Sequence, residues 1–128
     1  MINAVHTLIY SDDPPATRAF LRDVLGWPCV ESPESAPGWL IFGTGPSELG
    51  VHPTTYTWEG KDYSHPLHHE IALMCDDIEA TVTELTEKGA AFTGPVEDMG
   101  FGLGTNLQLP GAGEILVYEP RHPIAHGL

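Results

Sequence analysis

The sequence predicts an α+β fold, a single domain built from two similar βαβββ modules. Three observations lead to this prediction. The chain has 128 residues, which is an ordinary length for one domain. Its 41% hydrophobic residues are enough for a buried core. Two segments that begin 64 residues apart match each other without a gap, and such internal similarity indicates a repeated structural unit.

The repeat begins with an apolar run that ends in two aspartates. Residues 6–13 read HTLIYSDD and residues 70–77 read EIALMCDD, and an Ala-Thr pair follows both segments in the same register. The apolar runs are rich in residues that favour strands, so we expect strands over 5–10 and 69–75.

A helix follows each of these strands. Asp13 and Asp77 are suitable N-caps, because a short carboxylate accepts hydrogen bonds from the free N–H groups of a first helical turn. Gly26 and Gly89 stand where the two helices are expected to end.

Three short strands complete each module. In the first half they are expected at about 29–31, 38–42 and 48–52, and in the second at about 91–93, 104–109 and 114–119. Module one therefore covers about 1–53 and module two about 68–123. Between them, residues 54–67 form the expected linker, a polar loop with three aromatic side chains.

The charge balance restricts the partners. Only five Lys and Arg residues face 18 Asp and Glu residues, which gives a formal net charge of −13. Nucleic-acid binding is excluded for want of a basic patch. An acidic surface favours neutral or cationic ligands, and solubility alone explains the charge equally well.

The expected location is the cytoplasm. No apolar run is long enough to cross a membrane, so no membrane partner is expected. The first residues lack the features of a signal peptide, and two cysteines are too few for a disulfide framework.

Four segments resemble the vicinal oxygen chelate superfamily, which includes glyoxalases, bleomycin-resistance proteins and extradiol dioxygenases. The two repeat segments carry the likeness together with residues 48–53 (ELGVHP) and 109–120 (LPGAGEILVYEP). The resemblance implies that the modules form a half-open, mostly antiparallel barrel, often completed by a second copy in a homodimer. It also implies a site on the concave face of that barrel.

Carried over by position, the resemblance nominates His6, His52, Glu70 and one residue of the final strand as metal ligands. The family's usual position on that strand holds Val117, which cannot ligate, and Glu119 lies two residues further on the same face. The implied ion is a divalent Fe, Mn, Ni, Co or Zn. Glu70 or Glu119 would also act as general base. We expect His52 rather than Glu48 to face the site, because Glu48 begins its strand.

Two functions follow from these residues. One is a metal-dependent lyase, isomerase or dioxygenase that acts on a small oxygenated molecule. The other is a metal-free protein of the bleomycin-resistance type that sequesters a cationic or aromatic compound, with ligand-binding side chains at Trp39, Tyr56, Trp58 and Phe101. His65, His68 and His69 form a cluster to which the sequence assigns no role.

Overall fold

The computed structural model describes residues 1, 4, 6–31 and 38–128. The predicted helices are present as α1 (Pro14–Asp23) and α2 (Ile78–Glu87). Both predicted N-caps are confirmed, since Asp13 and Asp77 accept hydrogen bonds from the amides of Ala16 and Ala80. Gly26 and Gly89 lie just beyond the helices and have positive φ, the conformation that favours glycine at a helix end.

A four-stranded sheet forms the centre of the molecule, in the order β5-β8-β7-β6. Its strands are β5 (Ala72–Met74), β6 (Phe92–Asp98), β7 (Gly102–Leu109) and β8 (Gly113–Pro120). β5 runs parallel to β8, and the other neighbours are antiparallel. The second half of the chain therefore has the expected order of strand, helix and three strands.

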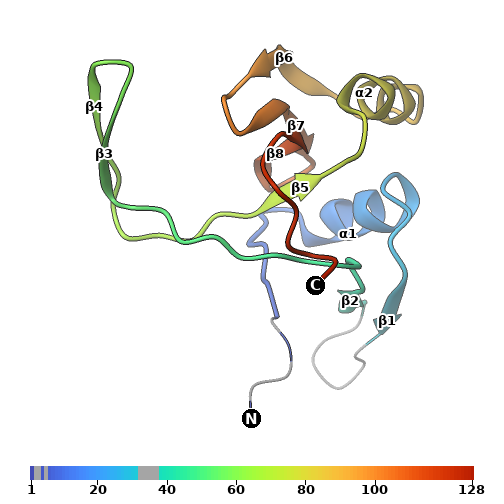
Figure 1. The fold of residues 1–128 in the computed structure, drawn as a ribbon. Helices are drawn as coiled ribbons and strands as arrows, with labels where there is room; N and C mark the ends of the chain where they lie inside the picture. Colours follow the sequence, from blue (N-terminus) through green and yellow to red (C-terminus); the bar gives the residue numbers. More distant parts are fainter. Residues whose placement is uncertain (2–3, 5, 32–37) are drawn as a thin grey trace.

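Both helices cover the same face of this sheet (Figure 1). The buried core joins Phe20 and Leu21 of α1 and Ile78 of α2 to Leu107 and Val117 of the sheet. Hydrogen bonds also fix the start of α1 to the β7–β8 turn: the amide of Asp12 donates to the carbonyl of Gly111 at 2.7 Å, and the Thr17 hydroxyl donates to that of Pro110. The other face of the sheet, which we call the open face, is turned away from the helices.

The first half of the chain differs from the prediction. β1 (Cys29–Glu31) and β2 (Leu40–Phe42) pair as a separate two-stranded sheet. The described residues 6–10 and 48–52 are not strands, and all of them except the partly buried Glu48 are exposed, so the strands predicted there are wrong. These segments have no neighbouring strand to pair their backbone N–H and C=O groups, so the extended conformation stabilises them little.

The predicted linker is a hairpin rather than a loop. β3 (Thr55–Trp58) pairs with β4 (Lys61–Ser64), and Glu59 and Gly60 make the two-residue turn with positive φ. Positive φ at both central residues is typical of a type I′ turn, which matches the twist of the strands. Residues 43–71, which we call the arm, carry this hairpin away from the helices (Figure 1).

The predicted barrel is not closed. The strands of the described chain fall into three separate sheets of two, two and four strands. A barrel needs an unbroken ladder of hydrogen bonds around its circumference. None of the helices in the described part of the chain has the length and apolar character needed to span a membrane.

Candidate functional site

The open face of the four-stranded sheet is set by the alternation of side chains along its strands. Ile115 and Val117 of β8 point into the core beneath the helices. Leu116 and Tyr118 therefore point to the opposite side. Tyr118 is partly buried there, and burial, with a smaller effect from Glu48, raises the pKa of its phenol. Its ring meets the ring of Phe101 edge to face, with centroids 5.3 Å apart.

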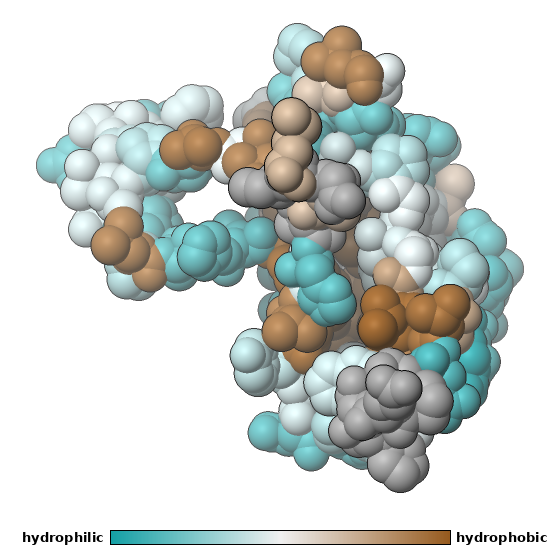
Figure 2. All heavy atoms as spheres, turned by 90° about the horizontal axis from the view of Figure 1, so that it is seen from below, coloured by the Kyte–Doolittle hydropathy of each residue, from teal (hydrophilic) through white to brown (hydrophobic). Residues whose placement is uncertain are grey.

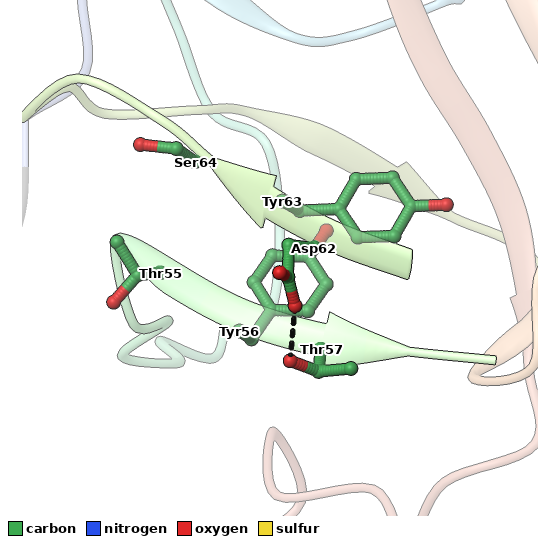
Figure 3. A pocket seen from close by; sticks show the side chains of 6 residues that line it. All are labelled: Thr55, Tyr56, Thr57, Asp62, Tyr63 and Ser64. Carbon is green, nitrogen blue, oxygen red and sulfur yellow. Dashed lines mark hydrogen bonds between the residues drawn. The ribbon is translucent and has the colours of Figure 1, made fainter. Parts of the chain in front are cut away.

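The hairpin of the arm presents an aromatic face. The rings of Tyr56 and Tyr63 stack with their centroids 5.1 Å apart and their planes 9° apart (Figure 3). The ammonium group of Lys61 lies 5.5 Å from the centroid of the Tyr63 ring. On the other face of the hairpin, the Thr57 hydroxyl donates to the Asp62 carboxylate at 2.7 Å. A shallow pocket of about 420 Å³ is lined by Thr55, Tyr56, Thr57, Asp62, Tyr63 and Ser64.

The tip of the hairpin touches the turn between β6 and β7. A Cβ built on Gly100 would lie 3.4 Å from two ring atoms of Trp58, so the indole packs directly on this glycine. Phe101, the next residue, is 46% exposed and Trp58 is 53% exposed. Figure 2 shows an opening between the arm and the body of the molecule.

Two of the predicted metal ligands, His52 and Glu70, lie at the root of the arm. His52 is exposed, its Nδ1 lies 2.7 Å from the carbonyl oxygen of Pro53, and its ring meets that of Tyr56 edge to face. The side chain of Glu70 is 83% exposed, and one of its oxygens lies 3.2 Å from His68 Nε2. The carbonyl of Pro66 and then the Glu70 carboxylate raise the pKa of His68.

The histidine cluster that the sequence left without a role connects these two ligands. The His65 ring lies 6.1 Å from that of His52 and 6.2 Å from that of His68. Its Nε2 is also 3.3 Å from the Tyr56 hydroxyl. A chain of three imidazoles therefore runs from His52 towards Glu70.

Glu119 lies in a different environment. One carboxylate oxygen accepts a hydrogen bond from the amide of Ile78, at the first residue of α2, at 3.2 Å. In the parallel ladder of β5 and β8, Met74 pairs with Tyr118, which puts Glu119 next to Cys75. Glu70 instead precedes β5 and lies beside His68.

The four predicted metal ligands do not form one site. His6 is exposed. His52 and Glu70 lie at the root of the arm, and Glu119 lies beside the first residue of α2. Among the described residues, no group of three or more His, Cys, Asp or Glu side chains is close enough to hold a metal ion. The present arrangement therefore does not fit the implied divalent ion, whose stable binding needs several ligands at one point.

The predicted ligand-binding aromatics divide into two places. Trp58 packs on Gly100 at the β6–β7 turn, next to Phe101 in the sequence, and Tyr56 shares a hairpin face with Trp58. Trp39 instead lies beside α1, where the guanidinium of Arg18 stands 5.2 Å from its ring centroid. The sequence counted Tyr63 among the three aromatic side chains of the linker without nominating it, and it missed Tyr118, although the apolar positions 115 and 117 signal that residue 118 faces the other side.

Comparison with known proteins gives one family. The family model for the glyoxalase/bleomycin resistance protein/dioxygenase superfamily matches residues 3–120. No curated protein sequence matches the chain.

Solved structures of similar fold cover nearly the whole chain. A lactoylglutathione lyase from Agrobacterium tumefaciens has a TM-score of 0.59 and 19% identity, over 92% of this chain and 94% of its own. TnmS3, an antibiotic binding protein from Streptomyces sp. CB03234, has a TM-score of 0.57 and 20% identity, over 93% and 97%. A superfamily member from Nocardioides has a TM-score of 0.60 and 14% identity, over 98% and 91%.

Proposed function

The chain belongs to the glyoxalase/bleomycin resistance protein/dioxygenase superfamily, and we propose that it binds a flat aromatic or cationic small molecule without converting it. The binding site in this proposal is the space between the aromatic face of the arm and the open face of the sheet. The ligand is held by Tyr56, Trp58 and Phe101, which the sequence nominated, together with Tyr63 and Tyr118.

The contact of Trp58 with Gly100 carries the proposal. It brings the indole against the residue that precedes Phe101 in the sequence, so the aromatic side chains of the arm come close to those of the sheet. Aromatic rings stack on planar ligands, and their faces attract cations. A net charge of −13 increases the local concentration of a cationic ligand near such a surface.

The solved relatives are consistent with either function that the sequence suggested. One is named as an antibiotic binding protein and another as a lactoylglutathione lyase. Both share less than a quarter of their residues with this chain, so the fold is what they have in common with it. The choice between binding and catalysis therefore depends on the site itself.

A metal-dependent enzyme is the second candidate, and the gathering of His52, His65, His68 and Glu70 at the root of the arm favours it. The ion would be a divalent Fe, Mn, Ni, Co or Zn, and His6 and Glu119 would have to move to join it. Because the present arrangement does not fit a metal, this candidate requires a rearrangement that the binding function does not require.

A fluorescence titration with a planar aromatic cation, such as ethidium, tests the binding proposal. We expect saturable binding that falls at least tenfold in Trp58→Ala, because one stacking surface is removed. Trp39→Phe is the matched control and is expected to bind normally, since its ring lies beside α1. Equal affinity in Trp58→Ala and wild type would contradict the proposed site.

Elemental analysis of tag-free protein, purified without chelator, separates the two candidates. Binding of ethidium together with no metal, even after incubation with each candidate ion, supports the binding protein. About one equivalent of metal that is lost in His52→Ala/Glu70→Ala would overturn it in favour of the metalloenzyme.

We further propose that the protein forms a homodimer in the cytoplasm. Large apolar side chains are exposed in the segments that were expected to be strands of module one: Leu8, Leu49 and Val51 are 52%, 80% and 93% exposed. Large apolar side chains as exposed as these are typical of segments that pair with another chain. The free thiols of Cys29 and Cys75 are consistent with a reducing compartment.

A further inference from the structure

Residues 121–126, which follow β8, run from the sheet to the first residues of the arm (Figure 1). Their first anchor is at the β6–β7 turn. The amide of Arg121 donates to the carbonyl of Phe101 at 2.8 Å, and its guanidinium contacts the Asp98 carboxylate at 2.6 Å. The segment therefore begins beside the two aromatic residues of the open face.

The second anchor is Glu48. One oxygen of its carboxylate accepts hydrogen bonds from two consecutive amides, those of Ala125 at 2.8 Å and His126 at 3.1 Å. The side chain is only 17% exposed, and an anion removed from water needs such donors. Bonds between a charged group and backbone amides are stronger than bonds between neutral groups. Glu48 therefore ties residues 125 and 126 to a segment 77 residues away in the sequence.

Between the anchors, the segment contacts the open face through His122. Its Nδ1 lies 2.8 Å from the carbonyl oxygen of Pro123, which can only accept, so Nδ1 carries a hydrogen. In the neutral ring Nε2 is then an acceptor, and the Tyr118 hydroxyl donates to it at 2.9 Å. The same Nε2 lies 3.7 Å from the second oxygen of Glu48. The polar end of Tyr118 is thus occupied by the segment itself.

We propose that residues 121–126 are a releasable strap across the open face, fastened by Glu48, and that release of this fastening admits the ligand to Tyr118 and Phe101. This inference rests on the proposed function, because it concerns access to the same site. The Asp98 and Arg121 anchor stays in place when the strap opens. The two amide bonds to Glu48 break, and the hydrogen bond between Tyr118 and His122 breaks with them.

Two variants weaken the contact between Glu48 and the strap, one at the acceptor and one at a donor. Glu48→Gln removes the charge from the acceptor, and Ala125→Pro removes one of the two N–H donors without changing Glu48. Glu31→Gln is the matched control, since Glu31 is an exposed carboxylate on β1. Hydrogen exchange of the peptide that contains residues 121–128 measures the strap, and stopped-flow fluorescence measures the association rate of ethidium.

We expect amide exchange and ethidium association to become about tenfold faster in both strap variants, and to be unchanged in Glu31→Gln. Binding by the strap variants when wild type binds nothing would also support the strap. Faster exchange with an unchanged association rate in both variants overturns the strap and leaves the binding proposal intact. No binding by any form of the protein overturns both, and unchanged exchange overturns the fastening by Glu48.

Discussion

Gly102 of β7 packs against the backbone of β8. A Cβ at this position would overlap the carbonyl oxygen of Glu119 and lie 2.9 Å from the Tyr118 ring. Gly102→Ala therefore forces the two strands apart, and we expect it to lower the free energy of unfolding by about 1–3 kcal/mol. Urea denaturation measures this change. Gly50→Ala, with no atom near its new Cβ, is the control and should change stability by less than about 0.5 kcal/mol.

The Glu48 carboxylate makes stability depend on pH. The amide of Ala125 is the main cause that lowers its pKa, with smaller contributions from His126 and His122. A carboxyl group with a lowered pKa in the folded state stabilises the protein above its unfolded pKa of about 4.3. That stabilisation is lost as the pH falls through the lower folded value.

Melting temperatures of wild type and Glu48→Gln between pH 7 and pH 3 test this dependence. We expect wild type to melt higher at pH 7, and the difference between the two proteins to shrink as the pH falls below about 4.3. We expect the melting temperature of Glu31→Gln to equal that of wild type at every pH in this range. A difference that stays constant down to pH 3 would mean that the charge of Glu48 contributes nothing to the fold.

At the scale of elements, the side chain of Glu119 connects β8 to the start of α2. Its carboxylate accepts the amide of Ile78, a residue that is 1% exposed. Glu119→Ala leaves that amide without its acceptor, so we expect a loss of about 1–2 kcal/mol in unfolding free energy. Glu97→Ala, an exposed glutamate of β6, should be nearly neutral. If Glu119→Ala is equally neutral, the hydrogen bond to α2 does not stabilise the protein.

The helices were predictable because their signals are local. Asp13 and Asp77 directly precede the helices that they cap. Gly26 and Gly89 supply the left-handed conformation that ends a helix. The hairpin of the arm was missed although its signal is also local. Alternating side chains surround the two-residue turn at Glu59 and Gly60, and the polar composition of this stretch concealed it.

Two of the four strands predicted for module one are absent for the opposite reason: residues 29–31 and 40–42 pair as β1 and β2, whereas the described residues 6–10 and 48–52 form no strand. Residues 6–10 and 70–74 share a pattern, but only residues 72–74 of the second segment become a strand, because β8 lies beside them. A strand depends on a neighbour far away in the sequence, which local patterns do not supply. The predicted metal site failed for the same reason. His6 and His52 belong to the two segments that form no strand, so no sheet brings them close to Glu70 and Glu119.

At the scale of the whole molecule, those unpaired segments give the last prediction. Val51 is 93% exposed in the single chain, so Val51→Lys is harmless to a monomer, whereas in a dimer it puts a charge into an apolar contact. We expect wild type to sediment with twice the mass of one chain and Val51→Lys to sediment as a monomer. Thr83→Lys, on the exposed side of α2, should remain dimeric.

Ethidium binding by the two lysine variants then relates assembly to the site. If a second copy covers the exposed segments and steadies the arm, Val51→Lys weakens binding together with dimerisation, and Thr83→Lys leaves both unchanged. Wild type that sediments as a monomer at high concentration would contradict the dimer. The aromatic site would in that case belong to one chain alone, since Trp58 and Gly100 already meet within it.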